Sequence, residues 1–348
     1  MTQAPPLQYV VRAGDPLRDR GAVLSAWRGN LGHEDRIAAK YDWFYLACPH
    51  GPPLLELLSE GGDSCLGTAC AGRRRLRLRG KDIRAGVLVD LVVMPEHRSL
   101  GPALMLQQGL IAASEAHLDV LYGFPNPKAV ALCKRVGYRH LTDIVRYARV
   151  LRHRRYLQAR MPGWLARPTG WLADAAVALR DAWRRLRDPR LRREWSTGAD
   201  ARMDALWRDS PQGEGLVGVR DQLHAKWRFD ESPLAVVRYL WLIDARSNVA
   251  QAWFATRVQD EALHLLDFWS ANGAAGPSPQ HVRAVLAAAH AEGLASVSVE
   301  IAGSEEQLRA WKDCGFQPRS RRPVYARWNR DATNDPPNWF LTSADEDE

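Results

Sequence analysis

The sequence predicts an α+β fold built from two copies of one domain, with a basic helical insert between them. Segments with strand and helix patterns alternate through the first copy, and the same order returns in the second half of the chain. A segment rich in arginine and tryptophan separates the two. The 348 residues are a length typical of two domains. We therefore expect domains at 8–150 and 195–330, an insert at 151–194 and an acidic tail at 331–348.

In the first copy, apolar runs bounded by glycine and proline predict the strands, and apolar residues three and four apart predict the helices. We expect strands at 9–12, 54–58, 65–71, 85–94, 120–123 and 144–151. We expect helices at 16–27, 33–45, 101–117 and 127–135. The Gly61–Asp63 turn indicates a hairpin between the second and third strands, and Pro95 ends the strongly apolar fourth strand.

Three short matches indicate that the second copy repeats the first. They pair 39–44 with 225–229, 89–92 with 266–269, and 134–138 with 312–316. The spacing agrees, since Asp90 precedes Gly137 by 47 positions and Asp267 precedes Gly315 by 48. Agreement of spacing across separate weak matches supports a repeat more strongly than any single match does.

The composition excludes several classes of protein. Hydrophobic residues make up 46% of the chain and charged residues 25%, so a wholly disordered chain is excluded. The chain lacks a long uninterrupted apolar run, and Met1–Gln8 lacks the features of a secretory signal. Five scattered cysteines without a C-x-x-C pair, and histidines without metal-ligand spacing, predict no disulfide framework and no metal site. These features favour a cytoplasmic protein.

The basic charge is concentrated in the insert. Residues 151–194 hold twelve arginines and four acidic residues, a net charge of +8 that equals the +8 of the whole chain. We expect no nucleic-acid binding, because this basic segment comes without a recognisable nucleic-acid-binding motif. Apolar residues at 171–186 form one stripe of a helix, which either packs between the copies or makes a peripheral contact with an anionic membrane. We expect the acidic end, 345–348, to be a solvated tail.

The segment 92–104 joins a buried strand to a helix through a short loop. The first amides of a helix have no intrahelical partner and lie at the positive end of the helix dipole, so they bind phosphate groups. Gly101 allows a ligand to approach the backbone closely, and Pro102 fits the first turn of a helix. The sequence therefore predicts an anion site at this helix N-terminus, where His97 and Arg98 add charge.

The order strand, R-x-x-G-x-A (Arg98, Gly101, Ala103), helix resembles the acyl-CoA-binding motif of the GNAT (Gcn5-related) N-acetyltransferase superfamily. A later family pattern, N-x-x-A-x-x-L-Y-x-x-x-G-F, is similar to the segment from Asn126 to Tyr138. The resemblance covers the first copy well and reaches the second only through the repeat. It implies two tandem domains, each a mixed, mostly antiparallel sheet flanked by helices, with acetyl-CoA bound by the first.

The resemblance also implies which residues hold the co-substrate. In the family, the loop amides bind the CoA pyrophosphate, and the adjoining strand lies beside the acyl group. The residues carried over to CoA binding are Val92, Val93, Met94, His97, Arg98, Ser99, Leu100, Gly101, Pro102, Ala103 and Asn126. Asn126 also fits a helix N-cap, and the two roles are compatible.

Three departures from the family pattern bear on the chemistry. Cys133 stands where the family often has a tyrosine that acts as general acid, so Cys133 or a bound water would protonate the leaving thiolate. Cys133 also fits a buried apolar position. Pro102 removes one potential phosphate-binding amide. In the second copy a glycine-rich loop, 272–279, replaces the motif without supplying a cation, so we expect that copy not to bind CoA tightly.

Transfer of an acyl group to an amine requires a neutral nitrogen, whereas a free alkyl ammonium has a pKa of about 10. A carboxylate near the acyl group can take that proton, directly or through water. Asp90 lies where family members often place such an acid, although it also fits a strand residue that faces solvent or pairs with an arginine of 73–79. The thioester oxygen needs a hydrogen-bond donor, and the amides of Val93 and Met94 are candidates.

We therefore predict a cytoplasmic enzyme that moves an acetyl group from acetyl-CoA to an amine of a small molecule or amino sugar by direct attack, without a metal. Two alternatives remain open. One is a non-catalytic protein that binds acyl-CoA or scaffolds an assembly at a membrane through the insert. The other is an aminoacyl transferase that acts on cell-wall precursors, which the CoA loop disfavours.

Overall fold

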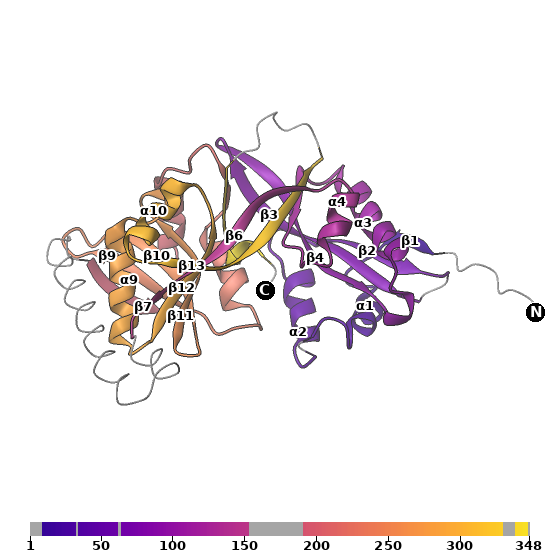
Figure 1. The fold of residues 1–348 in the computed structure, drawn as a ribbon, viewed down its shortest axis with the longest axis horizontal. Coiled ribbons are helices and arrows are strands. Elements are labelled where there is room, and N and C mark those ends of the chain that lie inside the picture. Colours follow the sequence, from indigo (N-terminus) through magenta and orange to yellow (C-terminus); the bar gives the residue numbers. More distant parts are fainter. Residues whose placement is uncertain (1–8, 33, 62–63, 153–190, 330–337, 347–348) are drawn as a thin grey trace, which may run out of the picture.

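The computed structural model describes residues 9–32, 34–61, 64–152, 191–329 and 338–346. The chain forms two lobes that share one 14-stranded sheet (Figure 1). Along its main path the strand order is β1-β2-β3-β4-β5-β13-β6-β12-β11-β10-β9-β7, and β8 and β14 branch from it. This mixed sheet with flanking helices confirms the predicted α+β class.

The elements of the first half follow the predicted order. Its strands are β1 (Val10–Ala13), β2 (Leu54–Ser59), β3 (Gly67–Leu78), β4 (Lys81–Val93), β5 (Val120–Gly123) and β6 (Arg139–Val150). Its helices are α1 (Arg20–Trp27), α2 (Ile37–Tyr41), α3 (Leu100–Ser114) and α4 (Val130–Arg135), with a π-helical turn η1 (Asp42–Leu46) and a 3-10 turn η2 (Pro95–His97). The main difference from the prediction is β3, which runs on to Leu78 instead of ending at 71.

The second half has a similar order. Its strands are β7 (Leu191–Ser196), β8 (Leu216–Gly218), β9 (Arg238–Asp244), β10 (Ala250–Gln259), β11 (Ala262–Ser270), β12 (Ser296–Ala302), β13 (Gln317–Trp328) and β14 (Trp339–Thr342). Its helices are α7 (Arg202–Asp209), α8 (Gln222–Ala225), α9 (Pro279–Ala291) and α10 (Glu305–Asp313), with turns η3 (Lys226–Asp230), η4 (Gly273–Ala275) and η5 (Ser343–Asp345). Because β7 begins at Leu191, the last residues of the predicted insert belong to a strand. The amphipathic stretch 171–186 lies outside the described residues.

None of the helices in the described part of the chain combines the length and the apolar character that crossing a bilayer requires.

The two halves exchange one strand each, β6 and β13. β13, from the second half, pairs with β5 over Tyr325–Trp328. β6, from the first half, pairs with β12 over 145–150. The two exchanged strands also pair with each other, so they lie side by side where the lobes meet (Figure 1). Neither half therefore completes its sheet without a strand from the other.

Two tryptophans join the halves at equivalent positions. Trp43 in η1 and Trp227 in η3 stack with ring centroids 5.3 Å apart, and both are buried. Each indole Nε1–H donates to the backbone carbonyl of the other tryptophan, at 2.6 and 3.2 Å. The sequence match of 39–44 with 225–229 is out of register with this pairing. The structure equates the two tryptophans because each is the second residue of a π-helical turn.

In the segment 73–79, arginines alternate with Leu76 and Leu78, a pattern that predicts an exposed strand face. The structure buries one of these charges, Arg74, which lies on the same face as the two leucines. Arg74 is 3% exposed and lies over the rings of Phe44, at 5.1 Å, and Trp227, at 4.9 Å. Its Nη2–H donates to the backbone carbonyl of Glu346 at 3.0 Å. Aromatic faces and a carbonyl replace part of the lost hydration, so a guanidinium can be buried at this interface.

Of the predicted solvated tail, the described residues Asp345 and Glu346 are buried instead of exposed. β14 and η5 are largely buried, and the carboxylates of Asp345 and Glu346 are 2.7 Å from Arg220 and 2.6 Å from Arg322, respectively. The reason is electrostatic, because Arg220 is 1% exposed and a buried guanidinium requires carboxylate partners. The acidic end thus supplies counter-charges to arginines of the second half.

We predict that Trp43→Ala and Trp227→Ala each lower the free energy of unfolding by about 3–5 kcal/mol, because each change removes a buried aromatic ring. The double variant should lose clearly less than the sum, since the rings stack on each other and exchange hydrogen bonds. Urea denaturation of the full chain measures all three values. Strict additivity would show that the two tryptophans are not energetically coupled.

Candidate functional site

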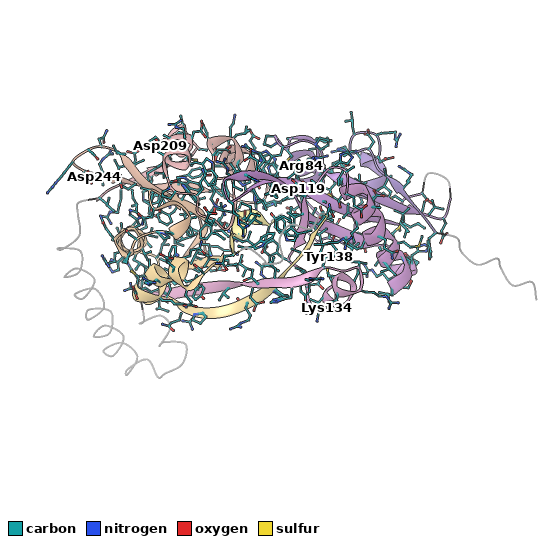
Figure 2. All side chains as sticks on the ribbon, turned by 90° about the horizontal axis from the view of Figure 1, so that it is seen from above. Arg84, Asp119, Lys134, Tyr138, Asp209 and Asp244 are labelled. Carbon is teal, nitrogen blue, oxygen red and sulfur yellow. The ribbon has the colours of Figure 1, made fainter. Side chains whose placement is uncertain are left out.

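The candidate site lies where strands β4 and β5 separate. The strands are parallel and pair only over Ala85–Val87 with Val120–Tyr122. At the start of this pairing Arg84 and Asp119 lie together (Figure 2), with the Nη2 atom 2.9 Å from Oδ1. Beyond Val87, β4 continues to Val93 with no further pairing to β5. Beyond Val87, one edge of β4 is therefore without a strand partner, as required for a ligand that binds along a strand edge; we call this unpaired place the opening.

A β-bulge lies in the middle of this free stretch of β4. The register with β3 shifts between Thr68 and Cys70, and Asp90 has a left-handed backbone conformation with φ of +50°. This conformation is strained for a residue other than glycine. The Thr68 hydroxyl donates to the Asp90 carbonyl and accepts from the Trp27 indole, both at 3.0 Å. Buried hydrogen bonds thus hold the bulge in place.

The Asp90 carboxylate is engaged by two buried partners. Lys40 Nζ is 2.9 Å from Oδ1, and the Tyr45 hydroxyl donates to Oδ2 at 3.0 Å. The Asp90 side chain is 2% exposed and that of Lys40 is 8% exposed. Burial and the charge of Asp90 hold the pKa of Tyr45 well above its usual value, so Tyr45 stays protonated and donates. Both carboxylate oxygens of Asp90 are thus engaged by protein groups at the bulge.

Sequence reasoning missed Lys40 and Tyr45. They lie 50 and 45 positions before Asp90, on α2 and η1, and no spacing pattern links them to β4. The sequence contains one indirect signal. Lys40 lies within 39–44, the segment matched to 225–229 in the repeat, and Tyr45 directly follows that segment.

At the end of β4, the backbone groups of Met94 point toward β3 and those of Val93 point toward the opening. The Met94 amide donates to the Leu66 carbonyl at 2.9 Å, so Met94 is not free to act as the predicted oxyanion donor. Successive strand residues turn their N–H and C=O groups to opposite sides. Val93 therefore faces away from β3, and its carbonyl accepts from Arg98 Nε at 3.0 Å. The Val93 amide points the same way and remains the candidate donor.

The N-terminus of α3 is open. Ser99 precedes the helix in an extended conformation, and its side chain makes no capping hydrogen bond. In the described part of the chain the amides of Ser99, Leu100 and Gly101 have no hydrogen-bond partner from loops or side chains, and Pro102 has no N–H. A Cβ added at Gly101 would meet nothing closer than Ser99 Oγ, at 4.0 Å. These amides are therefore available to an anion, and Ala103 follows in the first turn.

The side chains expected to add charge at this loop are held by protein partners. Arg98 bonds the Val93 carbonyl and Asn30 Oδ1, which fixes the loop between β4 and α3. His97 Nδ1 lies 3.1 Å from both the Tyr9 hydroxyl and the Glu60 carboxylate. These bonds fix the shape of the loop that carries the open amides.

Cys133 is buried in the core, and Asn126 forms a turn through its side chain. Cys133 is 6% exposed on α4, within the core between α3 and the sheet, and burial raises the pKa of its thiol. Its neighbour Tyr138, which follows α4 (Figure 2), is also buried, and its hydroxyl has no hydrogen-bond partner in the described part of the chain. Asn126 Oδ1 accepts from the amides of Lys128 and Ala129 at 3.0 Å, so it forms the turn that leads into α4.

The equivalent opening of the second half is filled by the chain itself. β11 and β12 pair over Ala262–Leu265, and beyond this point β14 pairs with β12. Asp267, the counterpart of Asp90, contacts Arg220 at 3.0 Å and accepts from the Thr342 hydroxyl at 2.7 Å. The C-terminal segment thus lies where the first half leaves an edge of β4 free.

Helix α9, the counterpart of α3, is closed by its own residues. Ser278 Oγ accepts from the His281 amide at 3.2 Å, and the His281 side chain accepts from the Ser278 amide at 3.3 Å. This capping box uses amides that an anion would need. The two halves therefore differ at both parts of the site, the strand opening and the helix N-terminus.

The fold is similar to several solved structures. A probable N-acyltransferase from Enterococcus faecalis V583 superposes with a TM-score of 0.64 at 10% identity, covering 92% of this chain and 72% of that chain. A GCN5-related N-acetyltransferase from Kribbella flavida gives 0.58 at 13% identity, covering 92% and 71%. A putative acetyltransferase from Pyrococcus horikoshii gives 0.53 at 11% identity, covering 99% of both chains. These likenesses show the fold of GCN5-related N-acetyltransferases. No family model and no curated protein sequence matches the chain.

The buried ion pair between Asp90 and Lys40 can be tested by substituting each residue and both together. Asp90→Asn leaves Lys40 buried without its counter-charge and should lower the free energy of unfolding by about 3–5 kcal/mol. Lys40→Met should cost a similar amount, and the double variant should cost less than the sum. Urea denaturation measures these values. Unchanged stability of Asp90→Asn together with lost turnover would instead restore Asp90 as a general base.

Glu56 on β2 lies against α3, and burial raises its pKa to about 6. Because the folded-state pKa is raised, ionisation of Glu56 opposes folding as the pH rises through about 6. Glu56→Gln should therefore increase the free energy of unfolding by about 1–2 kcal/mol at pH 8, where the native carboxyl group is ionised, and have little effect at pH 4.5, where it is protonated in the folded state. Thermal unfolding at both pH values tests this. The exposed control Glu115→Gln should leave the free energy of unfolding unchanged at both pH values. An equal gain of Glu56→Gln at pH 8 and pH 4.5 would contradict the raised pKa of Glu56.

Proposed function

We propose that this protein is an acyltransferase that moves an acetyl group from acetyl-CoA to an amine of a small molecule or amino sugar. The proposal takes the two halves as tandem copies of the N-acetyltransferase fold, of which only the first keeps a co-substrate site. The observation that carries it is the contrast between the halves. The first half has a free edge of β4 and open amides at Ser99–Gly101, whereas the second half fills both places.

In this proposal the open amides of α3 bind the diphosphate of CoA, and the rest of the co-substrate follows the free edge of β4. An anion at this place gains from the helix dipole and from N–H groups that have no other partner. The Val93 amide would then donate to the thioester oxygen as negative charge develops there. The bulge at Asp90, held by Lys40 and Tyr45, keeps this strand edge in shape.

The transfer proceeds by direct attack. The neutral amine nitrogen forms a bond to the thioester carbonyl carbon, the tetrahedral intermediate collapses, and the carbon–sulfur bond breaks. Because Asp90 and Cys133 are both buried and Asp90 is ion-paired, the proposal routes the amine proton through water, which also returns a proton to the CoA thiolate. Proximity of the two substrates would supply most of the rate enhancement.

The burial of Asp90 and Cys133 also favours a second candidate function, binding of acyl-CoA without catalysis. A chain whose predicted acid and base both lie in the core can bind acyl-CoA without transferring the acyl group. Release of CoA thiol from acetyl-CoA in the presence of an amine panel separates the two candidates, since only the enzyme depends on the amine.

We predict that the native chain binds one CoA, and that Gly101→Asp weakens this binding roughly a hundredfold by placing a negative charge at the diphosphate. The substitution should fold normally, because space is open around the position and its backbone is not left-handed. Calorimetry with desulfo-CoA measures affinity and stoichiometry. Gly21→Asp, at an exposed glycine in the first turn of α1, is the matched control and should bind as the native chain does.

Unchanged affinity in Gly101→Asp would exclude the α3 site. Two equivalents of bound CoA per chain would contradict the assignment of the second half as closed.

A further inference from the structure

A groove of about 660 Å³ lies on the sheet of the second half, away from α3 and its open amides. Its floor comes from neighbouring strands β10, β11, β12 and β6, and parts of η3 and η5 form its sides. The volume is in the range of small-molecule sites. The polar residues on the strands that form the floor are Arg146, Arg257, Gln259, His264, Ser296, Ser298 and Glu300.

Two arginines of the groove, Arg146 and Arg257, have no carboxylate partner among the described residues. Arg257 on β10 has a buried Nε atom without a hydrogen-bond partner, and no ion pair joins Arg257 or Arg146 on β6 to another described residue. A buried guanidinium N–H without a partner is costly, and an oxyanion in the groove would satisfy it. Both arginines line the same cavity, so one ligand can contact both.

The acidic residues of the groove do not cancel these charges. Glu300 and Glu346 each lie 2.6 Å from Arg322, which neutralises part of their charge. Asp260 is exposed at the turn between β10 and β11 and forms no ion pair with either free arginine. Arg228 is already used, because it donates to the carbonyls of Ser343 and Ala344. The positive charge of Arg146 and Arg257 therefore remains available.

A histidine and a serine lie between these arginines. His264 on β11 is directly opposite Ser298 on β12, with Nδ1 2.8 Å from the serine Oγ. Burial, followed by the charges of Arg257 and Arg146, lowers the pKa of His264, so its ring is neutral near pH 7. A bound anion would reverse this effect and raise the pKa of His264. The ring therefore reports on occupancy of the groove.

We propose that this groove binds a small molecule bearing a phosphate or carboxylate group, held by Arg146 and Arg257 with the serine hydroxyls beside them. The guanidinium forks match the oxygens of either group. This site is separate from the proposed CoA site and does not depend on it. Two residues connect the groove to the first half: Arg146 lies on β6, and Glu346, which also lines the groove, accepts from Arg74 through its carbonyl.

Calorimetric titration of the full chain with pyrophosphate and with citrate, at constant ionic strength, tests the proposal. Both titrations include saturating desulfo-CoA and are repeated in Gly101→Asp, so that binding at α3 is not counted. We expect at least one probe to bind with one equivalent per chain, and Arg257→Met and Arg146→Met each to weaken it roughly tenfold or more. The matched control Arg309→Met removes the same charge from α10 and should leave the affinity unchanged. The stronger probe identifies which oxyanion the groove prefers.

Two further measurements keep the test independent of folding defects. Arg257→Lys retains the charge but not the fork, and should bind more weakly than the native chain yet more tightly than Arg257→Met. In NMR titrations of the native chain, saturating probe should raise the pKa of His264. The proposal is overturned if neither probe binds, or if Arg257→Met and Arg146→Met bind as tightly as Arg309→Met. If Gly101→Asp loses CoA binding but binds pyrophosphate or citrate as the native chain does, the two sites are independent.

Discussion

The exchange of β6 and β13 is the constraint on which the rest of the structure depends. Each of these strands follows the core of one half in sequence and lies beside a strand of the other half in space. Their pairing fixes the two sheets into one and brings η1 and η3 close enough for Trp43 and Trp227 to stack. The interface therefore combines backbone hydrogen bonds with buried aromatic area, and neither is available to one half alone.

The halves differ in the cation that pairs with an equivalent buried carboxylate, Asp90 in the first half and Asp267 in the second. In the first half Asp90 is neutralised by Lys40 from its own lobe, which leaves the strand edge above it free. In the second half Arg220 sits between Asp267 and Asp345, so a single cation joins β11 to the C-terminal segment. A lysine offers a point charge, whereas a guanidinium can hold two carboxylates at once. That difference accounts for one open and one filled gap between otherwise similar strands.

Local patterns in the sequence were enough for the elements and the loop of the first half. Hydrophobic periodicity located β5 and α3 closely, and the glycine and proline around Gly101 marked an open helix N-terminus. Contacts over long sequence distances were not accessible in this way. The burial of Arg74, the partners of Asp90 and the inward course of Asp345 each depend on residues tens to hundreds of positions away. Charge alone predicted exposure for Arg74 and Asp345, because a single sequence does not show which opposite charge or aromatic face will meet them.

The strand exchange has a consequence for biosynthesis. β5 is complete at Gly123, but its neighbour β13 ends at Trp328, so about two hundred further residues must leave the ribosome before this edge is covered. Such distant pairing is slow to form, and an uncovered strand edge invites association with other chains. Until β13 has been synthesised, the first lobe therefore exposes an unpaired strand edge through which partly folded chains can associate.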